Sequence, residues 1–587
     1  MYKKILFFVL VVLALSSCEK DFLEPAIENN RDLNDIQDEP AFALGLLYNG
    51  YTRLPGGFSF NEMATDDAVS SDEDNTYSNM ATGQWASNFN PVGQWQNSFS
   101  AIQYLNLMLS KADTVTYAEN PAVNQMFKDR TKGEVYGLRA YFMHRLLEAH
   151  GGMAGGQLLG VPIMLEPQDA STDFSSFQRA TFEEGMQQIY SDIEKAIDLL
   201  PLDSEDIGSE SEIPDKYLNM DADVNDYNRV LGKTNRLRMT ERIALAIRSR
   251  ASLLAASPAF NQGTTTTWED AANYAADVLD INGGVGGLTP DGLTWYNDGG
   301  VIDNLTAGAN PSEILWRTNM PGPSSALEEQ LYPPTLFGDG LVNPTQNLVS
   351  SFPMANGFPI DHMESGYDAS NPYTNRDPRL MEFIVVNGSQ MGPFDETIIT
   401  AVDGGTNDGL NIVESSTRTG YYLRKLLRED VNLDPQSVNQ QRHINPLIRY
   451  TEIYLNYAEA ANEAWGPEGT GGNAYSAYDV VRAIRERAGL SANGGDTYLE
   501  SIKGDQDAMR ELIRNERRLE LSFEGFRFWD LRRWNEDLSE MALGDRILNG
   551  NHEIIPVEPR LYSEYMIYGP IPYSEILKFG FTQNMGW

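Results

Sequence analysis

Apolar residues recur every three or four positions over much of the chain, which is the pattern of helices with one buried face. Clear stripes run over 135–149 and 182–200. Thr181 precedes the second stripe and Glu184 follows three residues later, so the spacing predicts a capping box, and Pro201 predicts where this helix ends. The same periodicity predicts further helices over 38–54, 92–111, 239–256, 268–281, 447–465, 474–488 and 505–528.

The predicted helices come in adjacent pairs, as stacked helix hairpins require. The pattern therefore predicts an all-α dominated fold on a tetratricopeptide-like helix-hairpin scaffold, although no repeat of about 34 residues can be traced. The intervening stretch 283–446 is rich in Gly, Pro, Asn and Asp and is too long for a connector. We expect a loop-rich lobe with a few short strands there, inserted between an N-terminal helical part, 36–282, and a C-terminal helical part, 447–587.

The first residues of the chain carry an export pattern. Two lysines are followed by an apolar run, Ile5–Leu15, which is typical of a secretory signal and too short for the roughly 20 residues that span a bilayer. Leu15-Ser16-Ser17-Cys18 looks like a lipobox. We therefore predict a lipoprotein signal peptide over 1–17, a lipid on Cys18, and a polar leader over 18–35.

Charge and cysteine content exclude several classes of protein. The 587 residues include 44 Lys+Arg and 84 Asp+Glu, a net charge of −40, which argues against a nucleic-acid partner. Cys18 is the single cysteine, so no internal disulfide can form.

Motifs for catalysis or cofactor binding are missing from the sequence. It has no H-E-x-x-H, no G-x-S-x-G and no phosphate loop, and its five histidines are scattered. We predict no catalytic residue, no metal and no cofactor, although so many carboxylates leave a glycosidase pair open. Asp66, Asp67 and the acidic run 72–74 could ligate calcium, but a solvated acidic loop is the preferred interpretation.

Arginines and glutamates alternate at helical spacing over 510–524. This pattern could form an anion site, but pairing across turns and with a neighbouring helix is favoured, with Leu512, Leu519 and Phe523 facing the core. Paired arginines would also give Trp529 and Trp534 guanidinium planes to stack on.

Seven groups of residues, taken in order from about residue 17 to 534, form a recognisable set of motifs: Ser17–Leu23, Arg139–Phe142 with Gly151-Gly152 and Gly160–Pro162, Ala256–Asn261, Arg449–Ala460, Arg482–Leu490, Asn515–Leu521 and Glu524–Trp534. This ordered set resembles the SusD/RagB family of lipid-anchored nutrient-binding proteins of Bacteroidetes outer membranes. An eight-residue spacer, Met153 to Gly160, departs from the family's pattern of glycines followed by Val-Pro.

The resemblance implies a non-catalytic outer-membrane lipoprotein facing the cell exterior, which delivers oligosaccharides to a TonB-dependent, SusC-like transporter. Peptide capture, a structural role beside the transporter and surface glycoside hydrolysis remain alternatives. Sugars bind flat aromatic rings flanked by polar side chains, and the resemblance implies a ligand surface built from the early loop and the inserted lobe. The candidate ligand-binding residues are Tyr77, Trp85, Asn88, Trp295, Tyr296 and Trp316.

Overall fold

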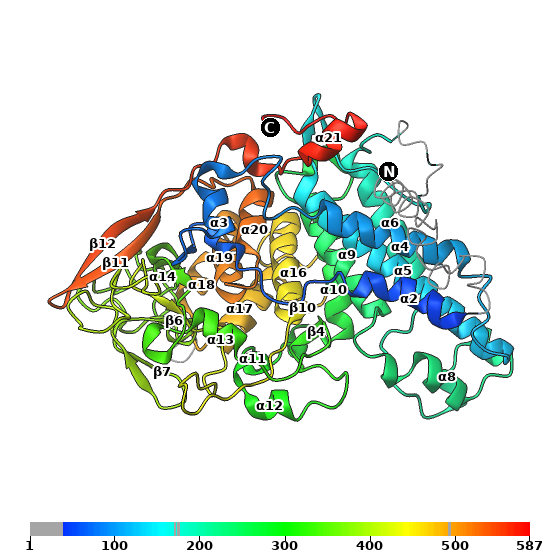
Figure 1. Cartoon of the computed structure of the whole chain (residues 1–587), viewed down its shortest axis with the longest axis horizontal. Coiled ribbons are helices and arrows are strands. Elements are labelled where there is room, and N and C mark those ends of the chain that lie inside the picture. Colours follow the sequence, from blue (N-terminus) through cyan, green and yellow to red (C-terminus); the bar gives the residue numbers. More distant parts are fainter. Residues whose placement is uncertain (1–38, 169–171, 173–176, 491–494) are drawn as a thin grey trace, which may run out of the picture.

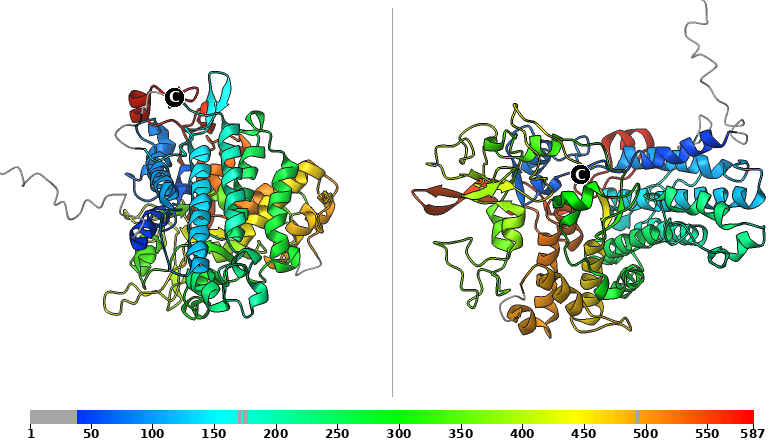
Figure 2. Two further views of the ribbon diagram at one scale, coloured as in Figure 1. Left: turned by 90° about the vertical axis from the view of Figure 1, so that its right-hand side faces the viewer. Right: turned by 90° about the horizontal axis from the view of Figure 1, so that it is seen from below.

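Helices gather at one end of the molecule and irregular chain at the other (Figures 1 and 2). The structure is a computed structural model that describes residues 39–168, 172, 177–490 and 495–587. Helices dominate these residues, so the predicted all-α dominated class is confirmed. The predicted signal peptide, the polar leader and the predicted lipidation site Cys18 all lie outside the described residues.

The long helices lie close to the positions predicted from the apolar stripes. In the bundle, α5 packs against α4 and α6, and α10 packs against α9 and α16. The long helices are α2 (Pro40–Tyr51), α4 (Trp95–Lys111), α5 (Pro121–His150), α6 (Phe182–Leu199), α9 (Glu241–Ala256), α10 (Trp268–Ile281), α16 (Tyr450–Trp465), α17 (Ala477–Arg487), α19 (Gln506–Glu520) and α20 (Arg527–Trp534). Shorter ones are α3 (Thr76–Asn79), α7 (Asp215–Leu218), α8 (Val224–Leu231), α18 (Thr497–Ile502) and α21 (Tyr573–Phe579).

The ends of α6 follow local sequence signals. The Thr181 hydroxyl accepts from the Glu184 N–H at 3.2 Å, and the Glu184 carboxylate accepts from the Thr181 N–H at 2.8 Å. The predicted capping box is therefore confirmed. The helix ends at Leu199, two residues before Pro201, as predicted.

The segment 505–528, predicted as one helix, is two helices. α19 ends at Glu520 and α20 begins at Arg527, because Phe523 (φ 62°) and Gly525 (φ 83°) adopt left-handed backbone between them. Leu512, Leu519 and Phe523 are buried, as predicted. The favoured pairing of the charges over 510–524 is also confirmed, for example by Arg517 with Asp530 at 2.7 Å.

The stretch 283–446 contains short elements, and its residues form most of a second apolar core. Phe60, Met63 and Ala68 of the early loop and Leu519 and Phe523 of the C-terminal part complete that core. Its helices are α11 (Thr294–Asn297), α12 (Gly299–Asp303), α13 (Ala326–Leu331), α14 (Gln346–Ser351) and α15 (Arg379–Phe383). Its strands are β4 (Ile314–Arg317), β5 (Val342–Pro344), β6 (Ile384–Val385), β7 (Ser389–Met391), β8 (Glu396–Ile398) and β9 (Tyr422–Leu423).

Two strand pairs join the inserted stretch to the rest of the chain. β5 pairs antiparallel with β1 (Ala68–Ser70) of the early loop, and β4 pairs antiparallel with β10 (Pro446–Arg449), which leads directly into α16. The other pairs, β6 with β9 and β7 with β8, lie inside the stretch. The predicted boundaries at 282/283 and 446/447 stay predictions.

Two further hairpins lie outside the inserted stretch. β2 (Gly152–Ala154) pairs with β3 (Gln157–Leu159), and β11 (Ala542–Leu548) pairs with β12 (Asn551–Glu558). The Asn549-Gly550 turn has two positive φ angles, as a type I′ hairpin requires, and the β11–β12 hairpin projects from the loop-rich end (Figure 1). No helix among the described residues has the length and apolar character needed to cross a bilayer.

Candidate ligand-binding site

Trp85, the leading aromatic candidate, lies inside the protein. Its ring is only 3% exposed and meets the rings of Phe528 and Trp587 edge-on, with centroids 5.6 and 4.8 Å away. Its indole N–H donates to the Asn90 side-chain oxygen at 3.0 Å. The expectation that this ring is open to a ligand is wrong, because residues from the far end of the chain cover the loop.

The other aromatic candidates from the inserted stretch are also buried. Trp295 and Tyr296 of α11 pack edge-on against each other in the second core. Trp316 of β4 donates to the Leu237 carbonyl at 3.1 Å and packs against Tyr141 in the helical core. The expectation of open rings is wrong here too, since the short elements that carry them turn these side chains inward.

The two remaining candidates do reach solvent. Tyr77 of α3 is half-buried, and its side chain packs against the second core and the cluster around Trp85. Asn88 is exposed. The six candidates do not meet on one surface, because the four buried rings belong to three different apolar clusters.

Two acidic residues of the early loop are buried ion-pair partners. Arg518 and Arg527 hold the Asp66 carboxylate at 2.6 and 2.9 Å, and Arg518 also holds Asp67 at 2.5 Å. Burial alone would raise the pKa of Asp66, but the two arginines outweigh it and hold the pKa well below its usual range. Burial raises the pKa of Asp67, which the arginines offset only in part.

The interpretation of a solvated acidic loop is therefore wrong for Asp66 and Asp67, while the run 72–74 is exposed. Within the described ranges, no three His, Cys, Asp or Glu side chains converge as metal ligands.

An exposed aromatic ring that the sequence analysis missed lies beside this acidic run. Phe337 is 58% exposed and has a left-handed backbone (φ 65°) at the end of a short turn that follows Pro333 and Pro334. A side chain with a β-carbon at Gly338 would lie 2.3 Å from the Tyr332 carbonyl oxygen, so the turn depends on this glycine. Left-handed non-glycine backbone is a strained conformation that the surroundings must hold.

The surroundings do hold the Phe337 turn. The buried Asp408 carboxylate accepts from the Thr335 N–H at 2.8 Å and from its hydroxyl at 2.5 Å. On the other side, the Ser71 N–H donates to the Leu341 carbonyl at 3.0 Å and the Ser71 hydroxyl to the Asp339 carbonyl at 3.3 Å, so the exposed run 72–74 starts one residue from a contact with the chain that follows the turn. Phe337 with these carboxylates is called the Phe337 surface below. A Phe-Gly-Asp-Gly turn after two prolines was the sequence signal that could have revealed it.

A cavity of about 390 Å³ opens between the early loop and the two groups of helices. Tyr77 lies in its wall with two other half-buried rings, Phe58 and Phe526. Its helical side comes from α5, α9, α16 and α20. Pro55, Gly57, Ser59 and Asn97 are the exposed members of the wall, so the mouth lies between loop 53–61 and the first turn of α4.

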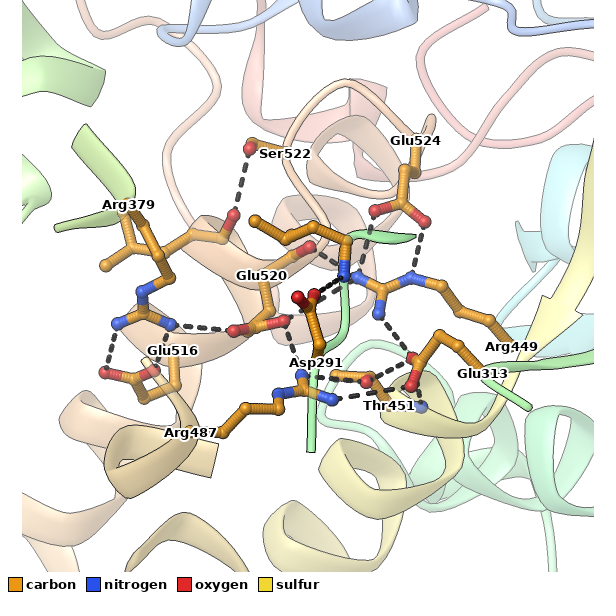
Figure 3. Close-up of polar contacts among 12 residues, drawn as sticks. Asp291, Glu313, Arg379, Arg449, Thr451, Arg487, Glu516, Glu520, Ser522 and Glu524 are labelled. Carbon is orange, nitrogen blue, oxygen red and sulfur yellow. Dashed lines mark hydrogen bonds and ion pairs between the residues drawn. The ribbon is translucent and has the colours of Figure 1, made fainter. Parts of the chain in front are cut away.

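The floor of the cavity belongs to a buried ion-pair network (Figure 3). Arg449 and Glu524 lie in the cavity wall and are joined at 2.7 Å. Behind them Arg449 contacts Glu313 at 2.8 Å, and Glu520 contacts Arg487 at 2.9 Å and Arg379 at 3.0 Å. The network joins Glu313, Arg379 and Lys425 of the inserted stretch to α19 and the turn that follows it. The network therefore connects one wall of the cavity to the inserted stretch and to the C-terminal helical part.

Sequence comparisons identify the family of this fold. A sequence model described as the SusD family matches residues 307–587, and one described as starch-binding associating with outer membrane matches residues 48–212. The two matches together cover about three quarters of the chain. The chain belongs to the SusD/RagB family. The family resemblance read from the motifs is thus confirmed.

Two curated SusD-like proteins of Formosa agariphila are similar to parts of the chain. One is 34% identical over 113 residues, which are 19% of this chain and 20% of that protein. The other is 31% identical over 157 residues, which are 26% of each. The matches thus span only about a quarter of these SusD-like relatives or less.

Solved SusD-like structures match the fold over nearly the whole chain. A SusD-like protein of Bacteroides fragilis is 22% identical and covers 96% of this chain and 100% of its own, with a TM-score of 0.71. A SusD-like carbohydrate-binding protein of the same species is 20% identical and covers 92% and 98%, with a TM-score of 0.66. A laminarin-binding SusD-like protein is 18% identical and covers 94% and 100%, with a TM-score of 0.55.

Proposed function

We propose that this SusD/RagB protein binds oligosaccharides at the cell surface without cleaving them. The observation that carries the proposal is the Phe337 surface, an open aromatic ring on a held turn whose following residues contact Ser71, just before an exposed acidic run. Sugar rings stack their C–H faces on such rings while polar groups bond their hydroxyls. Fold relatives named for binding carbohydrate and laminarin support the same ligand class.

Isothermal titration of the purified protein against a panel of oligosaccharides, laminarin included, tests this proposal. At least one glycan should bind, and Phe337→Ala should weaken it about tenfold, because losing about 1.4 kcal/mol of ring contact corresponds to that factor. Tyr573→Ala is the matched control, since Tyr573 is also exposed but lies on α21, and it should leave the affinity unchanged.

Other outcomes would select the alternatives. Binding of a peptide mixture with no glycan bound would indicate peptide capture, which relies on backbone pairing. Release of shorter sugars from a bound glycan would indicate a glycoside hydrolase. Absence of any ligand, with loss of the transporter complex when the protein is deleted, would indicate a structural subunit.

We also propose that Cys18 carries the lipid and that the protein delivers its ligand to a SusC-like TonB-dependent transporter in the outer membrane. Several acyl chains anchor a protein stably, whereas one is marginal. Cys18→Ala should therefore release the protein from the membrane fraction, and the transporter should co-purify with the unmodified protein. A variant that stays in the membrane fraction would contradict the anchor.

A further inference from the structure

Two polar side chains in the cavity wall are buried without the partners that buried polar groups normally have. Asn61 is 3% exposed, and its amide N–H donates to the Gly525 carbonyl at 3.3 Å, but its side-chain oxygen has no partner among the described residues. His144 is 4% exposed and makes no hydrogen bond within the described part of the chain. Both residues line the cavity, and the side chain of each carries an atom that is able to accept a hydrogen bond.

His144 is uncharged at neutral pH. Burial, with Arg250 and Arg145 nearby, lowers its pKa to about 3. A neutral imidazole carries one donor and one acceptor nitrogen, which matches the two-way hydrogen bonding of a hydroxyl group. The ring can therefore bond a hydroxyl group in either direction and brings no charge of its own to the site.

All the charged side chains of the wall except Arg53 are paired with a side chain of opposite charge. Each of its carboxylates contacts an arginine of the same wall: Glu148 with Arg145 at 3.1 Å, Glu524 with Arg449 and Asp530 with Arg517 both at 2.7 Å, and Glu452 with Arg250. Arg533 is held by Glu459 outside the wall. Arg53, at the mouth, donates to the Asn49 side chain at 2.8 Å. A charged ligand would have to break one of these pairs or go uncompensated inside.

The volume of the cavity and the aromatic rings in its wall also suit a small uncharged sugar. The volume of about 390 Å³ lies at the lower end of the ~300–1,000 Å³ typical of small-ligand sites. Phe58, Tyr77 and Phe526 offer half-buried ring surface in the wall. Aromatic surface beside unpartnered polar groups suits a molecule with apolar C–H faces and hydroxyl edges.

We propose that the cavity is a second binding site, separate from the Phe337 surface, for one uncharged sugar unit with free hydroxyls. The inference deepens the proposed glycan binding and rests on it. Asn61 and His144 bond hydroxyls of the sugar, and the half-buried rings contact its C–H faces. The cavity then takes a single neutral sugar independently of the Phe337 surface.

Two adjacent glycines at the mouth give a matched pair of variants. A β-carbon at Gly57, which lines the cavity, and one at Gly56, which does not, would each meet nothing within 4 Å. Both glycines are exposed, and neither has a positive φ. Gly57→Trp should block the mouth, whereas Gly56→Trp adds the same side chain one residue away. Asn97→Trp blocks the mouth from α4 and keeps the test valid if Gly57→Trp does not fold.

The experiment is a saturation-transfer NMR titration of the full protein with D-glucose, D-galactose and D-mannose, and with D-glucuronate and D-glucosamine as charged counterparts. At least one neutral hexose should bind more tightly than both charged sugars. Gly57→Trp or Asn97→Trp should weaken it at least tenfold, while Gly56→Trp and Phe337→Ala should leave it unchanged.

Four results would overturn the proposal: no hexose bound by the unmodified protein, binding that survives the blocked mouth, tighter binding of a charged counterpart, or loss of binding in Phe337→Ala. If hexose binding fails while oligosaccharides still bind, the cavity site alone is refuted. If both fail, the proposed function fails with it.

Discussion

Phe337 and Trp85 are aromatic residues of long loops, but only one of the two rings reaches solvent. The Phe337 turn is held by Asp408, and its ring is exposed. The Trp85 loop is covered by Phe528 and Trp587, so its ring stabilises the fold. At the scale of single residues, the side chains that distant parts of the sequence place over a loop decide whether its aromatic ring is open to a ligand.

Glu62 makes the stability of the fold depend on pH. It is fully buried, and its carboxylate accepts from the Gly525 N–H at 2.7 Å, while its second oxygen has no partner among the described residues. Burial raises its pKa from 4.5 to about 7. The folded state therefore keeps this proton up to about pH 7, whereas the unfolded chain loses it near pH 4.5. Stability falls as the pH rises through that window, by about 3 kcal/mol in total.

Glu62→Gln should remove this fall, because the amide does not titrate. The free energy of unfolding of the variant, measured by urea titration, should be about 3 kcal/mol higher than that of the unmodified protein at pH 8 and close to it at pH 4. Other titrating groups cancel in the difference between the two proteins. A difference that stays constant from pH 4 to pH 8 would show that Glu62 does not titrate in this window.

Helix ends could be predicted where the signal is local, and could not where it comes from elsewhere in the chain. Thr181, Glu184 and Pro201 lie within or beside α6 and predict both of its ends. The end of α19 depends on Lys425 of the inserted stretch, whose ammonium group donates to the carbonyls of Glu520 at 2.8 Å and Ser522 at 2.9 Å. A cation there satisfies carbonyls that a helix leaves without partners.

The difference between local signals and distant contacts also explains why most of the predicted binding site was wrong. Composition placed polar aromatic loops correctly on the chain, and Tyr77 does line the cavity. Trp85 is covered by Trp587 and Trp316 by Tyr141, contacts that no local pattern encodes. Asn61 and His144 were missed because their lack of partners is visible only in three dimensions.

The turn between α19 and α20 requires a glycine at position 525, because the backbone there is left-handed (φ 83°). A substitution at Gly525 tests this requirement. A β-carbon there would also lie 2.9 Å from the Ser59 hydroxyl oxygen. Gly525→Ala should lower the free energy of unfolding by about 1–2 kcal/mol, measured by urea titration.

Gly504 gives the control for this turn. It precedes α19, has no positive φ, and its added β-carbon would meet nothing within 4 Å. Gly504→Ala should leave stability unchanged or raise it slightly, because alanine reduces the freedom of the unfolded chain. Equal effects of the two substitutions would mean that the turn does not require left-handed backbone at Gly525.

The whole molecule carries a net charge of −40 and yet buries a dense group of cations between its parts. Arg379 and Lys425 come from the inserted stretch, and Arg449 and Arg487 come from the C-terminal part; all four contact carboxylates of α19 or the turn after it (Figure 3). Such pairs give little net stability over an apolar core, but removing one partner leaves charge buried without compensation. The network therefore ties the inserted stretch to the helices.

Glu520 lies at the centre of this network and is the strongest test of that role. Burial opposes its charge, but Arg487, Arg379 and Arg449 outweigh burial and lower its pKa to about 2. Glu520→Gln should lower the free energy of unfolding at pH 7 by about 3–5 kcal/mol. Glu486→Gln is the control: Glu486 is exposed, pairs with Arg482 at 3.9 Å, and should contribute less than about 0.5 kcal/mol.

The lowered pKa of Glu520 determines how the stability lost in Glu520→Gln should change with pH. A carboxylate with a lowered pKa contributes its full stability above the unfolded value near 4.5 and loses it as the pH falls toward 2. The difference in unfolding free energy between the unmodified protein and Glu520→Gln, measured by urea titration, should therefore be largest at pH 7 and smaller at pH 3. A difference below 1 kcal/mol at pH 7, or one that grows on acidification, would mean that the inserted stretch is held to the helices by its apolar contacts and not by these charges.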